Sequence, residues 1–231
     1  MEHLLKNKNM KKEKVPFAGD KKEGSWLLKR EEERFRNRLV PLVPRWMETY
    51  HLTMLTLVWS LLIIVFGFLA RYNIHFLWGI SALIFLQYIT DLLDGAVGRA
   101  RNTGLIKWGY YMDHLLDYFF LCSVLMSYGF LLPDYYKFMM FFLQAVIAGF
   151  MIHTFLSFAT KNAFTISYFG VGPTEMRILF ILLNTYMIFF GTHSVVVGIP
   201  YVLGISIFAL AVIVTKTQKE IWDLDMSLKK K

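Results

Sequence analysis

Six long apolar stretches alternate with short polar segments between about residue 50 and residue 215. Each stretch has roughly the 20 residues that an α-helix needs to cross a hydrocarbon core of about 30 Å. None shows the strict alternation over about ten residues that is typical of a membrane-barrel strand. The pattern therefore predicts six transmembrane helices, at residues 52–71, 75–97, 109–132, 135–159, 174–192 and 195–215.

The composition agrees with this interpretation. The chain is 56% hydrophobic and 18% charged, with a mean hydropathy of +0.45, which lies outside the usual composition of soluble domains. Its single cysteine, Cys122, excludes an intrachain disulfide and a cysteine-based metal site. The polar first fifty residues show no cleavable signal peptide, so we expect the first span to direct insertion. The predicted fold class is all-α integral membrane: six transmembrane helices with an N-terminal amphipathic juxtamembrane segment.

Positive charge is concentrated at the two ends of the chain. Lys and Arg are dense before residue 46 and recur after residue 215, and such residues are enriched on the cytoplasmic side of membranes. We therefore expect both termini in the cytoplasm, and an even number of spans places the loop from Gly98 to Trp108 there too. The chain divides into a basic tail with a juxtamembrane segment (1–45), a six-helix membrane domain (46–216) and a basic cytoplasmic C-terminal tail (217–231). In a bacterium the membrane would be the inner, cytoplasmic one.

Residues 26–38, WLLKREEERFRNR, have two interpretations. They form a surface helix with a Glu32–Arg36 pair at i,i+4 spacing, or a solvated charged tail that only sets topology. Pro41 and Pro44 would then bend the chain into the membrane. Neither interpretation gives the segment a catalytic role.

Four aspartates flank the loop between the second and third spans. Asp91 and Asp94 are three residues apart near the end of the second span, and Asp113 and Asp117 are four apart near the start of the third. Each pair shares one helix face, with axial separations of about 4.5 and 6 Å. Because the short loop makes the two helices antiparallel neighbours, we expect all four carboxylates to converge in one pocket.

Carboxylates are costly in a membrane helix, at about 2.5–3.5 kcal/mol each on insertion scales, and converging anions also repel one another. A cation must therefore compensate them. Arg99 lies past the end of its helix, and no other basic residue falls within the two apolar runs. Hard divalent ions with oxygen ligands fit better, and two of them would balance four aspartates in formal charge. We expect two ions, Mg²⁺ or Mn²⁺.

These residues resemble the signature of the CDP-alcohol phosphotransferase (CDP-alcohol phosphatidyltransferase) family, which is D-x-x-D-G-x-x-A-R, about eight residues, then G-x-x-x-D-x-x-x-D. The chain has Asp91-x-x-Asp94-Gly95-x-x-Gly98-Arg99, nine residues, then Gly109-x-x-x-Asp113-x-x-x-Asp117. Gly98 replaces the alanine of the family, and the spacer is one residue longer than usual. An alternative register takes Ala100-Arg101 as the Ala-Arg pair, which makes Arg101 the second candidate after Arg99.

The resemblance implies an enzyme of phospholipid synthesis that moves a phosphoalcohol group from a CDP-linked donor to an acceptor hydroxyl and releases CMP. The four aspartates would bind two metal ions. Asp113 and Asp117 are the catalytic candidates, and Asp117 matches the proposed general base, a role that is compatible with metal binding. The membrane domain is then the catalytic domain. The family also implies a homodimer among membrane lipids, and we expect no nucleic-acid partner.

The same resemblance implies a substrate site around the aspartates. Gly95 and Gly98 would border the cytidine pocket, Arg99 would contact the diphosphate of the donor, and Gly109 belongs to the same site. Each glycine also has a simpler interpretation as a helix-packing residue.

Three further residues give weaker signals. His153 in the fourth span and Glu175 before the fifth resemble, in short matches, the choline and ethanolamine phosphotransferase branch. A polar residue within a span is a functional candidate by default, although a hydrogen-bonded core histidine is the commoner outcome. Arg177, at the mouth of the fifth span, would receive an acceptor phosphate or a lipid headgroup, or would serve with Glu175 in helix capping and topology.

Several functions compete on this sequence. A CDP-diacylglycerol donor with a small polar acceptor competes with CDP-choline or CDP-ethanolamine and a diacylglycerol acceptor, and we favour phosphatidyl transfer for so short a chain. A divalent-cation transporter is the alternative from another class, because intramembrane acids also mark ion pathways. The acids cluster at one end, however, and the last two spans hold few ionisable residues, which disfavours a path through the membrane.

Overall fold

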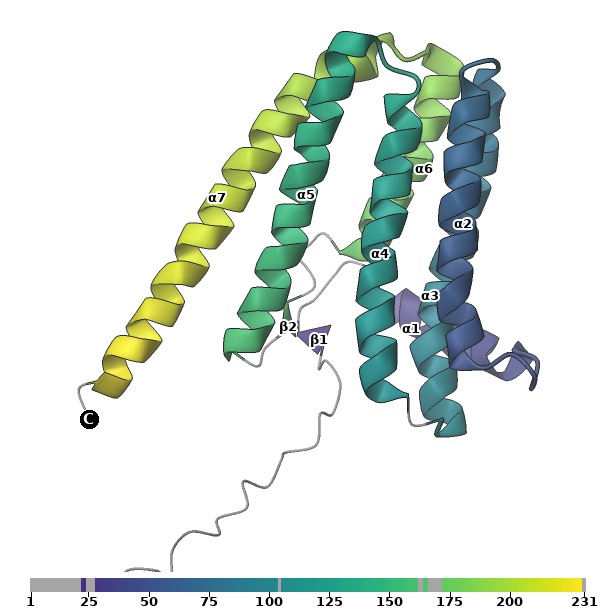
Figure 1. Cartoon of the computed structure of the whole chain (residues 1–231). Coiled ribbons are helices and arrows are strands. Elements are labelled where there is room, and N and C mark those ends of the chain that lie inside the picture. The colour runs from purple at the N-terminus through teal and green to yellow at the C-terminus, as the bar shows by residue number, and fades with distance from the viewer. Residues whose placement is uncertain (1–21, 24–27, 104, 162–163, 166–171, 230–231) are drawn as a thin grey trace, which may run out of the picture.

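The computed structural model describes residues 22–23, 28–103, 105–161, 164–165 and 172–229. Within these residues, long helices occupy all six places where a span is expected (Figure 1). They are α2 (Thr49–Ala70), α3 (Leu77–Arg101), α4 (Ile106–Gly129), α5 (Asp134–Lys161), α6 (Pro173–Phe190) and α7 (His193–Lys229). The all-helical class expected from the apolar pattern is confirmed.

Four helical segments are long and apolar enough to cross a membrane. They are α2, α3 together with the short helix η2 (Ile74–Phe76) before it, α5, and α7 up to Ser227. Helices α4 and α6 are not among these four. Both carry charged residues of the expected site, and each charge lowers the mean hydropathy of its helix. The structure thus supports an integral membrane protein with four candidate spans, and the count of six remains a prediction.

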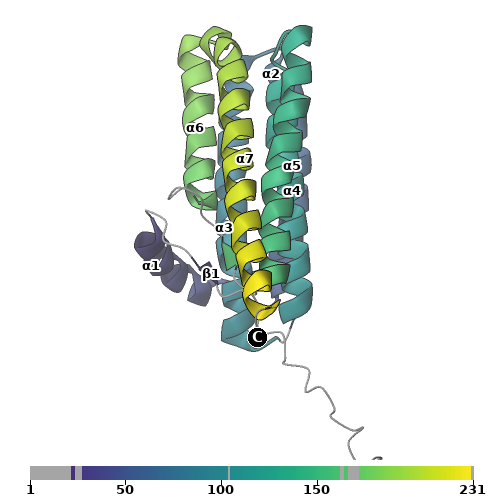
Figure 2. The ribbon, with the colours of Figure 1, turned by 90° about the vertical axis from the view of Figure 1, so that its left-hand side faces the viewer.

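Helix α2 is at the centre of the packing. It runs along both α3 and α4, while α6 packs against α3 (Figures 1 and 2). The apolar core between these helices includes Ile63, Ile80, Ile84 and Val124, whose side chains are inaccessible to solvent. Helices α5 and α7 pair with each other, and α5 also contacts α4. The site described below therefore depends mainly on α2, α3, α4 and α6.

Small residues bring α2 and α4 close together. The buried face of α2 includes a stripe of small side chains: Thr49, Thr53, Thr56, Ser60 and Gly67. A Cβ atom at Gly67 would overlap Ser127 of α4. Small residues let helix backbones approach in a membrane, where lipid provides no hydrophobic drive between helices. This close contact fixes α4 against the same helix that holds α3.

The outward surfaces of α5 and α7 are apolar. Large exposed side chains on these two helices include Phe141, Phe142, Tyr201 and Phe208. An apolar surface of this extent is rare on a soluble monomer and suits contact with lipid.

Most of the segment at 26–38 is helical, in agreement with the surface-helix interpretation. Helix α1 (Lys29–Leu39) leads into the 3₁₀ turn η1 (Val40–Leu42), and residues 26 and 27 lie outside the described residues. The Thr174 hydroxyl donates a 2.7 Å hydrogen bond to the Glu32 carboxylate, which ties α1 to the start of α6. The segment thus packs on the helical bundle.

Two short features complete the fold. Strand β1 (Lys22–Glu23) pairs in parallel with β2 (Phe164–Thr165), and this is the only strand pairing among the described residues. At the other end of the chain, α7 continues to Lys229 without a break at residue 216. The C-terminal tail predicted from residue 217 is therefore an extension of the last helix.

Candidate active site

A tight turn joins the two helices that carry the aspartates. Asn102 adopts the left-handed backbone conformation, with φ of 53°, at the C-cap of α3. Asn tolerates this conformation better than most residues do. The Thr103 N–H then donates to the Gly98 carbonyl at 3.2 Å, and α4 begins at Ile106. The end of α3 and the start of α4 consequently lie at the same end of the bundle (Figure 1).

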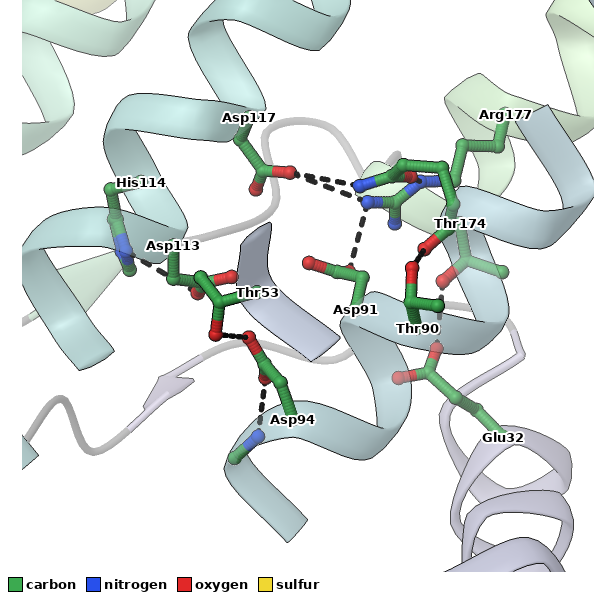
Figure 3. A network of polar contacts seen from close by, with 12 residues as sticks. Glu32, Thr53, Thr90, Asp91, Asp94, Asp113, His114, Asp117, Thr174 and Arg177 are labelled. Carbon is green, nitrogen blue, oxygen red and sulfur yellow. Dashed lines mark hydrogen bonds and ion pairs between the residues drawn. The ribbon is translucent and has the colours of Figure 1, made fainter. Parts of the chain in front are cut away.

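Three of the four aspartates come together across this turn. One carboxylate oxygen each from Asp91, Asp113 and Asp117, which we call the aspartate cluster, lies within 4.8 Å of the other two (Figure 3). All three residues are partly exposed. Carboxylate oxygens are the ligands that hard divalent ions such as Mg²⁺ prefer, so this donor set fits the metal expected from the sequence.

Asp94 is held by a different helix. Its carboxylate accepts a 2.9 Å hydrogen bond from the Thr53 hydroxyl of α2, and its backbone carbonyl accepts one from Thr49 at 3.1 Å. Asp94 is buried, with 7% of its surface exposed, and it is not part of the aspartate cluster. The structure therefore brings together three of the four carboxylates that the sequence placed in one pocket, and the fourth is hydrogen-bonded to a hydroxyl on α2.

A buried arginine from α6 reaches the aspartate cluster. Arg177 Nη2 lies 2.9 Å from Asp91 Oδ2 and 3.5 Å from Asp117 Oδ1 (Figure 3). The guanidinium group also lies over the rings of Tyr88 and Phe120, at 5.9 and 5.8 Å from their centroids. Arg177 is 6% exposed, so it is deep in the protein. From the sequence, Arg177 was expected at the mouth of its span, and only metal ions and Arg99 were considered as cations for the acids.

Gln87 links the arginine to the cluster. It is fully buried in α3, accepts a 2.7 Å hydrogen bond from Arg177 Nε, and donates one to Asp117 Oδ1 at 3.4 Å. Gln87 was not among the residues predicted for the site. The available signal was an amide in the middle of an apolar run, one helical turn before Asp91, where residues four apart share a face.

His114 and His153 differ in their positions relative to the site. His114 Nδ1 lies 3.5 Å from Asp113 Oδ2, and its ring packs against Tyr110 and Phe155. His114 is thus next to the aspartate cluster. His153 is partly buried in α5 and is not part of that cluster.

Glu175 serves as a helix cap in the structure. Its carboxylate accepts hydrogen bonds from the Gly172 N–H at 2.9 Å and from the Leu28 N–H at 3.3 Å. An acidic residue in the first turn also suits the helix dipole. Of the two interpretations that the sequence left open for Glu175, these contacts agree with capping.

The three motif glycines lie in different surroundings. A Cβ atom at Gly98 would come within 2.7 Å of Thr49 Oγ1, so Gly98 allows α3 to pack closely on α2. A Cβ atom at Gly95 would be 3.2 Å from Arg99 Nη1, whereas one at Gly109 would have no atom of the described residues within 4 Å. The space beside Gly109 is therefore open, which suits the approach of a ligand.

The two arginines of the alternative registers have distinct contacts. Arg101 donates hydrogen bonds to three backbone carbonyls before α2, those of Met47, Val43 and Pro44, at 2.6 to 3.1 Å. These bonds give Arg101 a structural role. Arg99 is exposed and lines, together with Arg36, an open pocket of about 350 Å³ between α1, η1 and the end of α3. Two guanidinium groups at one pocket suit an anionic ligand.

Comparison with known proteins agrees with the motif. The family model for CDP-alcohol phosphatidyltransferase matches residues 50–216 of the 231, which is well over half of the chain. Neither the curated proteins nor the solved structures give a match. The matched range contains the aspartate cluster, Gln87 and Arg177. The chain therefore belongs to the CDP-alcohol phosphatidyltransferase family, the membrane transferases that move a phosphoalcohol group from a CDP-linked donor to a hydroxyl acceptor.

Proposed function

We propose that this transferase binds two divalent metal ions at its aspartates and moves a phosphatidyl group from a CDP-linked lipid to an acceptor hydroxyl in phospholipid synthesis, with release of CMP. One observation carries the proposal: Asp91, Asp113 and Asp117 approach from two helices to within 4.8 Å. The family gives the reaction class, and this geometry supports a location for the chemistry at the turn between α3 and α4.

The metal would be held by the three carboxylates of the cluster, with Asp94 as a fourth ligand. The oxygen donor set favours Mg²⁺ or Mn²⁺. Ions bound there would neutralise the negative charge that develops on the phosphoryl oxygens during transfer. Thr53 already orients the Asp94 carboxylate through its 2.9 Å hydrogen bond, so this ligand is positioned before metal arrives.

Asp117 acts as the general base in this proposal. The acceptor oxygen attacks the phosphorus distal to cytidine and forms a new P–O bond, while the bond from that phosphorus to the oxygen of CMP breaks. The acceptor proton passes to the Asp117 carboxylate. Asp113 takes part as the neighbouring carboxylate, and His114, at 3.5 Å from it, helps to orient it.

Arg99 is the proposed contact for the diphosphate of the donor. Its pocket also contains Arg36, and planar guanidinium groups bind phosphate oxygens well. Gly95 beside Arg99 and the open space at Gly109 support the entry of a bulky nucleotide. Arg177 is already engaged by Gln87 and Asp91, so these contacts do not favour it as a ready receptor for an acceptor phosphate.

The proposed membrane arrangement has six crossings, with both termini and the active site in the cytoplasm. The density of Lys and Arg at both ends of the chain supports this orientation. Helices α4 and α6 would cross as part of the bundle, because their charged residues contact other helices. A homodimer is expected from the family.

A reconstituted assay tests the function and its alternatives. We would measure CMP release by the purified chain in lipid vesicles, with Mg²⁺, with Mn²⁺ and after chelation. One set receives CDP-diacylglycerol and small polar alcohols, and another receives CDP-choline or CDP-ethanolamine and diacylglycerol. Metal-dependent release with the first donor supports phosphatidyl transfer, and release only with the second assigns the chain to the choline and ethanolamine type. Transport of divalent ions without CMP release from any donor would refute the proposed enzymatic function.

A further inference from the structure

The guanidinium group of Arg177 contacts two of the three aspartates whose carboxylates would hold a metal ion. Its Nη2 atom is 2.9 Å from Asp91 Oδ2 and 3.5 Å from Asp117 Oδ1, and both aspartates belong to the cluster that fits a metal. A divalent ion binds carboxylate oxygens at about 2.0–2.6 Å. A metal ion and the guanidinium group would therefore be two neighbouring cations at the same carboxylates, and they would repel each other.

Arg177 cannot leave the cluster for water without a larger rearrangement. It is 6% exposed, its Nε donates to Gln87 at 2.7 Å, and its guanidinium group lies over the rings of Tyr88 and Phe120. A buried charge that loses its counter-charge is strongly destabilised. The arginine is thus held beside the acids by contacts from α3 and α4 that do not involve the carboxylates.

The aspartates, in turn, need a cation in the absence of metal. Three carboxylates within 4.8 Å repel one another, and Arg177 places a positive charge 2.9 Å from Asp91 and 3.5 Å from Asp117 (Figure 3). Gln87 fixes the orientation of the arginine, because its amide oxygen accepts from Arg177 while its amide nitrogen donates to Asp117. These contacts form one unit that joins α3, α4 and α6.

We infer that Arg177 is the internal counter-cation of the aspartate cluster: it compensates the acids before metal binds, and metal competes with it for the carboxylates of Asp91 and Asp117. This inference rests on the proposed function, because it takes the cluster to be a metal site. Its consequence is that the arginine weakens metal binding while it stabilises the empty site. A residue that served only to hold the helices together would have the opposite effect or none on metal affinity.

Direct measurement of Mn²⁺ binding tests the inference without turnover. The full chain is purified in lipid nanodiscs, and free Mn²⁺ is titrated by electron paramagnetic resonance. We expect Arg177→Gln to bind Mn²⁺ roughly tenfold more tightly than the wild type, a factor within the usual range of coupling between sites. Arg177→Lys keeps the positive charge and should stay closer to the wild type. Arg71→Gln is the matched control, because Arg71 is the C-cap residue of α2, at the end of that helix away from the site. The Mn²⁺ affinity of this variant should equal that of the wild type.

A second variant keeps Arg177 but removes the hydrogen bond that orients it. Gln87→Met has a similar shape but loses the hydrogen bonds to Arg177 and Asp117, so we expect Mn²⁺ to bind about threefold more tightly. Wild-type binding of Mn²⁺ with equal or weaker binding by both Arg177→Gln and Gln87→Met would overturn the inference and leave the proposed function intact. Absence of Mn²⁺ binding in the wild type and in all variants would overturn the metal site itself.

Discussion

The hydrogen bond from Thr53 to Asp94 provides a sharp test of how α2 prepares the site. The substitution Thr53→Val keeps the shape of the side chain and removes the hydroxyl that donates to Asp94 Oδ2 at 2.9 Å. Both residues are buried, at 2% and 7% exposure, so solvent cannot easily replace the lost bond. Asp94 would then be a buried acceptor with one donor fewer.

The expected size of the effect follows from this environment. Hydrogen bonds to charged groups contribute about 1.5–3 kcal/mol in soluble proteins, whereas interhelical bonds in a membrane average about 0.6 kcal/mol. Because Asp94 is acidic and lies near the end of its helix, we expect a coupling free energy of about 1–2 kcal/mol between Thr53 and Asp94. The measurement is a double-mutant cycle of Thr53→Val and Asp94→Asn, read from equilibrium unfolding in detergent.

The substitution Thr53→Val should also weaken metal binding at the site. Partners that orient metal ligands typically contribute 10- to 100-fold to metal affinity or activity, so Thr53→Val should need roughly tenfold more Mg²⁺ for half-maximal CMP release. Thr56→Val is the control, because Thr56 is buried on the same face of α2 and its hydroxyl makes no hydrogen bond among the described residues. A coupling within about 0.3 kcal/mol of zero, or an equal shift in Thr56→Val, would refute the role given to Thr53.

Three other outcomes follow from the site. Asp113→Asn should lower CMP release by at least about a hundredfold while the protein remains extractable and helical, because Asp113 supplies one of the three clustered ligand oxygens. Full activity of this variant would contradict the metal assignment. Arg99→Ala should raise the KM for the donor with little loss of stability. Arg101→Ala should instead lower the melting temperature, because it removes three hydrogen bonds to backbone carbonyls. The reverse pattern would favour the alternative register. Chelation should stop CMP release reversibly, and activity that persists in strong chelator would exclude a dissociable metal.

The positions of the helices could be predicted because they depend on local sequence. An apolar run of about 20 residues specifies a membrane helix whatever its neighbours are, and each of the six runs corresponds to a helix. The convergence of Asp91 with Asp113 and Asp117 was also accessible, since spacing on a helix and a short loop confine these residues to one end of two joined helices. These are short-range constraints.

The partners of the acids could not be predicted in the same way. Arg177 lies 86 residues after Asp91, and Thr53 lies 41 residues before Asp94. Their contacts depend on which helices pack together, and hydropathy does not encode that choice because every membrane helix is apolar around most of its surface. A cation for the carboxylates was therefore predicted, with metal and Arg99 as the candidates, whereas the arginine on another helix was missed.

The charged residues that lower the mean hydropathy of α4 and α6 also compensate one another. A carboxylate or a guanidinium group in a lone membrane helix costs about 2.5–3.5 kcal/mol on insertion scales. In the bundle, Asp117 of α4 and Asp91 of α3 both contact Arg177 of α6, so much of this cost is offset only after the helices have met. Helices α2, α3, α5 and α7 are long and apolar enough to cross a membrane, whereas α4 and α6 are not among these candidate spans. The residues that give the site its charge therefore also lower the hydropathy of α4 and α6, and a hydropathy criterion applied to each helix separately does not detect that these charges compensate one another.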